Sequence, residues 1–84
     1  MYLKALERAG TIRDLKLQPR FKLHVNGQLI CTYVADFEYE KELKDGEWIS
    51  IVEDTKGVET PEFKLKKKLM KAVLDIEINV VKKR

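Results

Sequence analysis

The chain has 84 residues, of which 44% are hydrophobic and 37% are charged, with four Gly and two Pro. This length and composition describe one folded domain spanning residues 1–84 and exclude a disordered tail. The 17 basic and 14 acidic residues give a net charge of +3, so the distribution of the charges says more about partners than their sum does.

One cysteine, Cys31, lies in a strand-like run, and a single cysteine makes neither an internal disulfide nor a zinc cluster. We interpret it as a small hydrophobic residue of the core. The sequence shows no signal peptide, and no apolar run approaches the roughly 18 residues that a membrane span needs. We therefore expect a cytoplasmic protein that has no membrane partner.

The first half of the chain alternates between short elements and turns. Residues 2–9 are helix formers, and Gly10 is expected to end this helix. The alternation over 21–25 predicts a strand, and Asn26-Gly27 is a strong hairpin signal. A long strand is expected over 29–40, followed by a polar turn at 44–46 and a further strand. The middle is thus predicted to be an antiparallel meander of about three strands.

The C-terminal part carries a clear helix signal. Thr60 is a suitable N-cap and Pro61 suits the first helical position, so a helix is expected to run to about Leu74. Residues 76–81 are expected to form a last strand. The predicted fold class is α/β, a small mixed sheet made of the meander and this strand, with helices packed on it.

Two neighbouring predicted strands carry acidic residues where chemistry could occur. Asp54 and Lys56 are two residues apart, so they point to the same face of a strand, while Glu53 points to the other unless a bulge intervenes. Asp36 interrupts an apolar and aromatic strand, and a carboxylate there is costly to bury without a partner. Antiparallel pairing would bring Asp36 near Asp54 and Lys56.

Two carboxylates and an ammonium group have a use in phosphoryl chemistry. Carboxylate oxygens are the usual protein ligands of Mg²⁺, which keeps other positions for water and substrate phosphate. A nearby lysine can position the attacking water or offset negative charge. The spacing alone favours an Asp–Lys surface pair with a strand-terminal Asp36, because a lone D-x-K often occurs by chance, and that alternative stays open.

The predicted C-terminal helix has an apolar arc and a lysine stripe. Its arc is formed by leucines, Phe63, Met70 and other apolar residues, and Lys66 falls inside this arc. Lys66 either snorkels or reaches towards the carboxylates or a phosphate. The other lysines suit a nucleic-acid backbone or form a solvated face. The tyrosines are interpreted as core or flanking residues.

Four ordered motifs carry a resemblance to a known family. The order LQPRF, YVADFEY, VEDTKG and TPEFKLKKKL, spread over residues 17–69, resembles phage- and prophage-borne nuclease-like proteins of the PD-(D/E)xK superfamily. The resemblance covers essentially the whole chain and implies the restriction-endonuclease-like fold.

The resemblance also implies roles for particular residues. Asp36 matches the aspartate of the "PD" element, with Ala35 in place of the proline, and Asp54 and Lys56 match "(D/E)xK". Asp36 and Asp54 would hold Mg²⁺, with Mn²⁺ as a substitute and Glu53 as an additional ligand, and Lys56 would be the catalytic lysine. Contacts to nucleic acid are expected from Gln18, Arg20, Lys64, Lys66 and Lys68. The implied activity is endonucleolytic cleavage of DNA, on branched or recombining substrates in a phage or bacterial host.

One departure from the family motivates two alternative functions. Relatives begin earlier, with a full first helix that carries a glutamate of the metal site, whereas this chain begins at what resembles the second half of that helix. Glu7 does not occupy the position of the family's glutamate, so we do not assign that glutamate's metal-binding role to Glu7. The alternatives are a DNA-binding protein without catalysis and a protein-interaction module, in which a partner, or a second copy in a homodimer, covers the part of the core that the shortened helix leaves exposed.

Overall fold

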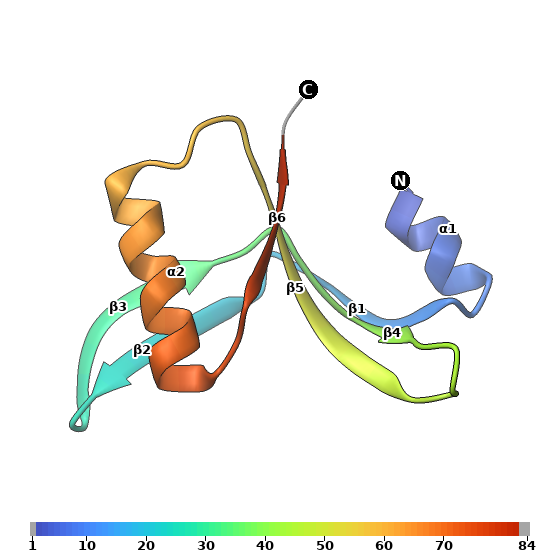
Figure 1. The fold of residues 1–84 in the computed structure, drawn as a ribbon, viewed down its shortest axis with the longest axis horizontal. Coiled ribbons are helices and arrows are strands. Elements are labelled where there is room, and N and C mark those ends of the chain that lie inside the picture. The colour runs from blue at the N-terminus through green and yellow to red at the C-terminus, as the bar shows by residue number, and fades with distance from the viewer. Residues whose placement is uncertain (1, 83–84) are drawn as a thin grey trace.

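The computed structural model describes residues 2–82, and Figure 1 shows their course. Two helices and six strands lie within this range, and none of its helices is long and apolar enough to cross a membrane. In chain order the elements are α1 (Tyr2–Arg8), β1 (Ile12–Leu17), β2 (Arg20–Val25), β3 (Gln28–Val34), β4 (Phe37–Glu42), β5 (Trp48–Lys56), α2 (Pro61–Leu74) and β6 (Ile78–Lys82). The expected α/β class with a mixed sheet is confirmed.

The strands form two sheets that share one bent ribbon. The main sheet has the order β1-β4-β5-β6, in which β6 is parallel to β5 and the other pairs are antiparallel; β2 and β3 form a separate hairpin. Because β1 pairs with β4 and β2 with β3, these four strands make one two-stranded ribbon that bends in its middle. Two backbone hydrogen bonds cross this bend, from Gln18 N to Asp36 O (2.9 Å) and from Ala35 N to Pro19 O (3.2 Å).

The single long strand predicted over 29–40 is therefore wrong. It ends at Val34 and resumes at Phe37, and the two halves belong to different sheets. Pro19 lies opposite the break and has no N–H to donate to a ladder. The residue before it, Gln18, has a left-handed backbone (φ 51°) that a straight strand does not accommodate.

The predicted three-strand meander is also corrected. Its first strand, β2, does not hydrogen-bond to the main sheet, whose edge is instead β1. β1 was not predicted because Ile12, Leu15 and Leu17 do not alternate. A β-bulge between Arg13 and Lys16 shifts the parity of this strand by one residue, which removes the period-2 signal.

The helix termini follow local sequence signals. The Thr60 hydroxyl accepts a hydrogen bond from Phe63 N (3.2 Å) at the start of α2, as predicted. α1 ends one residue earlier than predicted, and Gly10 (φ 82°) takes the left-handed conformation expected after a helix. The last strand begins at Ile78 rather than at residue 76, because Ile76 N still bonds to Met70 O as the helix ends.

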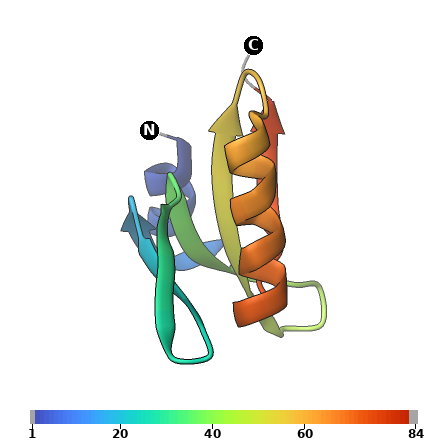
Figure 2. The same ribbon diagram turned by 90° about the vertical axis from the view of Figure 1, so that its left-hand side faces the viewer.

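Two groups of buried side chains lie on opposite sides of the molecule. The larger one joins α2, the hairpin and β5–β6, and contains Leu23, Tyr33, Ala35, Val52, Phe63, Met70 and Ile78. The smaller one joins α1 to β1 and β4 through Leu3, Ile12 and Tyr39. Figure 2 shows α2 alongside β5 and β6, with the hairpin next to it. The site lies at the edge of the larger group.

The buried face of α2 differs from the predicted apolar arc. Leu65 is 60% exposed, whereas Phe63 and Met70 are buried and Lys66 and Lys67 are half-buried between them. Lys66 lies on the buried side as its position in the predicted arc implied, whereas Lys67, expected on the opposite side, is half-buried as well. Cys31, predicted to be a core residue, is partly buried and packs against the larger group.

Candidate functional site

The bend of the ribbon places Asp36 against β5. Its backbone N donates to Glu53 O (3.2 Å), and its Oδ2 accepts from Thr55 N (2.8 Å). The Asp36 carboxylate thus accepts a hydrogen bond that a backbone carbonyl of a paired strand would otherwise accept, because the ribbon bends away from β5 at this point. Backbone and side chain together fix Asp36 beside the C-terminal end of β5.

Asp54 is the one buried charged residue of the described part of the chain, with 2% of its surface exposed. Its Oδ2 accepts a hydrogen bond from the Tyr33 hydroxyl and lies 3.4 Å from Lys56 Nζ. The predicted parity is confirmed, because Asp54 and Lys56 lie on the same face of β5. Asp36 is a direct side-chain neighbour of Asp54. The structure therefore brings Asp36, Asp54 and Lys56 together.

The electrostatics of this cluster are unfavourable for two ionised carboxyls. Burial raises the pKa of Asp54 above its ordinary value, and the neighbouring Asp36 raises it further. The hydrogen bond from Tyr33 and the charge of Lys56 act in the opposite direction without cancelling the rise. A second positive charge near the two carboxyls would relieve this repulsion.

Lys56 connects the carboxyl cluster to an open cleft. Its Nζ lies 4.8 Å from the centroid of the Phe63 ring, a cation–π distance, and its side chain is 32% exposed. The cleft has a volume of about 260 Å³ and runs between β3 and the first turns of α2. Its lining residues are Thr32, Tyr33, Val34, Lys56, Thr60, Glu62, Phe63 and Lys66. The two aspartates lie behind Tyr33 and Lys56 rather than on its wall.

Lys66 is the helix lysine that reaches this cleft. Its side chain is 28% exposed and its Nζ lies 3.3 Å from Glu62 Oε1, one turn earlier in α2. Lys66 and Lys56 therefore line the same cleft from two different elements. An anionic group in the cleft could contact both ammonium groups.

Glu53 lies apart from the cluster. It points to the opposite face of β5, where its Oε1 accepts a hydrogen bond from the Tyr39 hydroxyl (3.0 Å) in a cavity beside α1. Burial and this carboxylate raise the pKa of Tyr39 to about 12. No group of three or more His, Cys, Asp or Glu able to hold a metal ion occurs among residues 2–82. Of the three predicted ligands, Asp36 and Asp54 lie together, whereas Glu53 lies on the other face of β5.

Gln18 and Arg20 flank the bend without lining the cleft. The Gln18 backbone N donates to Asp36 O, so this residue contacts the site through its main chain, while its side chain and that of Arg20 are exposed. Three other non-glycine residues with positive φ are Asp or Asn, which tolerate that conformation, but Gln18 is not of that type. The bend next to Asp36 is therefore locally strained.

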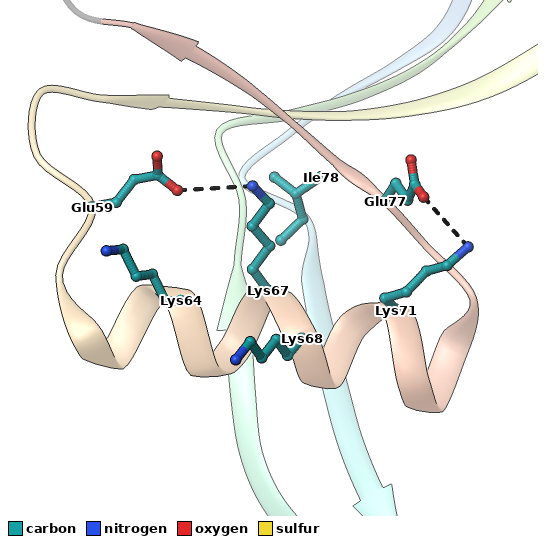
Figure 3. A pocket seen from close by; sticks show the side chains of 7 residues that line it. All are labelled: Glu59, Lys64, Lys67, Lys68, Lys71, Glu77 and Ile78. Carbon is teal, nitrogen blue, oxygen red and sulfur yellow. Dashed lines mark ion pairs between the residues drawn. The ribbon is translucent and has the colours of Figure 1, made fainter.

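Lys64 and Lys68 face a second cleft on the other side of α2. This cleft, of about 580 Å³, lies between α2 and β6 (Figure 3). Lys67 pairs there with Glu59 (3.8 Å) and Lys71 with Glu77 (3.5 Å). Within the range that the structure describes, Lys64 and Lys68 have no carboxylate within 4 Å. The lysines of the predicted stripe thus line this one cleft, whereas Lys66, predicted to lie in the apolar arc, lines the other.

Tyr33 is the site residue that the sequence analysis did not identify. It was interpreted as a core or flanking residue, and its ring is indeed buried, but its hydroxyl binds Asp54. Position gives a partial signal, because Tyr33 comes three residues before Asp36 in an apolar strand. The hairpin must fold back towards β5 for the two groups to meet, and that arrangement depends on the bend.

These features define a small α/β domain whose ribbon bend brings two carboxyls and a lysine to one edge of a mixed sheet. The chain belongs to the family described as protein of unknown function (DUF1064), whose sequence profile matches residues 1–83. Searches of the curated proteins and of the solved structures returned no significant match.

Proposed function

We propose that this protein is a Mg²⁺-dependent endonuclease that cleaves phosphodiester bonds in DNA. The supporting observation is the meeting of Asp36, Asp54 and Lys56 at the end of β5, next to a cleft that carries a second lysine. The resemblance to the PD-(D/E)xK superfamily, which rests on the order of four motifs, supports the same function and a restriction-endonuclease-like fold. The setting would be the cytoplasm of a bacterium or a phage-infected cell.

The donor set fits a divalent cation of the Mg²⁺ type. Mg²⁺ is commonly held by one or two carboxylates and keeps its other positions for water and phosphate. Asp36 and Asp54 supply two carboxyls that the fold holds together against their mutual repulsion. When bound, Mg²⁺ would lower the pKa of a water molecule and neutralise charge on a phosphodiester.

The remaining residues of the site would bind and orient the substrate. Lys56 lies between Asp54 and the cleft, so its ammonium group is placed to contact the scissile phosphate and offset charge that develops on it. Lys66, on the opposite wall, would contact a phosphate from α2. Phe63 fixes the Lys56 ammonium group through its ring face.

A second candidate function, DNA binding without cleavage, is favoured by a separate observation. Lys64 and Lys68 line a cleft on the far side of α2 from the carboxyl cluster, and neither is paired with a carboxylate within residues 2–82. Such lysines can bind phosphates whether or not the carboxyls hold a metal. The first candidate requires a bound cation for its action on DNA, whereas the second binds DNA with or without one.

The test is a cleavage assay with Mg²⁺ or Mn²⁺ on linear, single-stranded, nicked and four-way-junction DNA. Asp54→Asn and Lys56→Met should each reduce cleavage by about a hundredfold or more, because each removes a charged group at the reacting phosphate. Glu53→Gln is the matched control, since Glu53 neighbours Asp54 in sequence but faces the other side of β5. Salt-sensitive DNA binding without cutting would favour the second candidate, and neither binding nor cutting would refute both.

A further inference from the structure

The Tyr33 hydroxyl is held in place by its surroundings. The residue is 3% exposed, and its ring packs between Phe21 (centroids 6.4 Å apart) and Phe63 (6.2 Å). Its only hydrogen-bond partner in the described part of the chain is Oδ2 of Asp54. Because the ring cannot swing away without leaving the core, this donor is fixed in front of one carboxylate oxygen.

The two oxygens of Asp54 are consequently unequal. Oδ2 receives both the Tyr33 hydrogen bond and the contact from Lys56 Nζ at 3.4 Å. Among residues 2–82 no other donor contacts the Asp54 carboxylate, and its remaining polar neighbour is the carboxyl group of Asp36. Every fully buried side-chain oxygen in this range has a hydrogen-bond partner. Because no donor contacts Oδ1, this atom is not fully buried and keeps some contact with solvent. One oxygen is occupied and the other is available.

This asymmetry matters for the choice of cation. Ca²⁺ is large, takes 6–8 oxygen ligands and often uses both oxygens of one carboxylate, whereas Mg²⁺ requires near-octahedral geometry and keeps its waters. A carboxylate with one available oxygen suits Mg²⁺ better than Ca²⁺. We propose that Tyr33 is a specificity-determining residue that favours Mg²⁺ over Ca²⁺ by occupying Oδ2 of Asp54. This proposal rests on the metal site proposed above and specifies its selectivity.

The chain offers a closely matched control in Tyr39. It too is a buried strand tyrosine (7% exposed) whose hydroxyl donates to a carboxylate of β5, that of Glu53 at 3.0 Å. Tyr39 lies on the opposite face of the sheet, away from Asp36 and Asp54. Tyr39→Phe therefore removes an equivalent hydrogen bond without touching the carboxyl cluster.

The experiment measures cation binding rather than cleavage. MgCl₂ and CaCl₂ are titrated calorimetrically into the wild-type chain, Tyr33→Phe, Tyr39→Phe and Asp54→Asn, with circular dichroism to confirm that each variant is folded. Tyr33→Phe keeps the buried ring, so the core is preserved. We expect the ratio of Ca²⁺ affinity to Mg²⁺ affinity to rise about three- to tenfold in Tyr33→Phe, because Oδ2 then keeps only the longer contact from Lys56 and can join Oδ1 in binding Ca²⁺. It should stay at the wild-type value in Tyr39→Phe.

Each other outcome overturns a defined statement. An unchanged ratio in Tyr33→Phe, with saturable Mg²⁺ binding that Asp54→Asn removes, would refute the role of Tyr33 and leave the metal site intact. An equal rise in Tyr39→Phe would mean that loss of any buried hydroxyl loosens the domain, and would refute it as well. A wild-type chain that binds neither cation would refute both the metal site and the selectivity derived from it.

Discussion

The orientation of α2 decides which lysines face the clefts, and one pair of substitutions tests it. Met70 is fully buried against the hairpin and β5–β6, whereas Leu65 is 60% exposed, although the apolar pattern of the sequence places both inside. Truncation of a fully buried Met costs about 2–5 kcal/mol, as lost burial plus the cavity that remains. We therefore expect Met70→Ala to destabilise the fold by about 3 kcal/mol, which in a domain of this size lowers Tm by roughly 12–24 °C.

Leu65→Ala should behave differently. An exposed substitution changes stability by less than about 0.5 kcal/mol, and alanine is slightly the better helix former. Urea unfolding followed by far-UV circular dichroism measures both variants, and Met70→Leu, which conserves volume, should lose less than about 1.5 kcal/mol. If Leu65→Ala cost as much as Met70→Ala, α2 would be rotated, and Lys66 and Lys67 would not face the two clefts.

Two further predictions concern charge. Burial and the neighbouring Asp36 raise the pKa of Asp54 in the folded state. The folded state therefore retains a proton on Asp54 at pH values where the unfolded chain has lost it. The unfolding free energy of wild type minus that of Asp54→Asn should therefore fall as pH rises above about 4, the ordinary pKa of an aspartate. Urea midpoints that change in the opposite direction would contradict this. Replacing Lys64 and Lys68 together by Gln should make the slope of log binding constant against log salt shallower by about 1.8, in fluorescence anisotropy with labelled duplex DNA. Lys44→Gln, in the β4–β5 turn, should leave that slope unchanged; an equal effect there would mean that DNA senses only net charge.

Local signals in the sequence were sufficient where one residue type determines the geometry. Thr60 and Pro61 start α2 as predicted, since a hydroxyl acceptor and a missing N–H suit the first turn of a helix. Asn26-Gly27 forms the β2–β3 turn because both residues accept positive φ. Proximity of Asp36 to Asp54 was also predictable, since antiparallel strands that follow one another in the chain are usually neighbours.

The rest depended on interactions between distant segments. The break after Val34 cannot be read from an apolar run that continues through it, because its cause lies opposite, at Pro19. Lys67, unlike Lys66, was not expected on the buried side of α2; its stem covers apolar surface while its ammonium group reaches a cleft. Tyr33 acquires its partner only when the hairpin and the main sheet are placed relative to each other.

The bend joins the β2–β3 hairpin to the main sheet next to Asp36 and Asp54, so any movement of the hairpin relative to the sheet takes place about this point. Tyr33 is on the hairpin and Asp54 is on the main sheet, and theirs is the only side-chain hydrogen bond that joins the two sheets within residues 2–82. Any swing of the hairpin about the bend must lengthen or shorten this bond. Under the proposed nuclease function, a DNA substrate that displaced β2–β3 would therefore alter the hydrogen bond to Asp54 without contacting Asp54 itself.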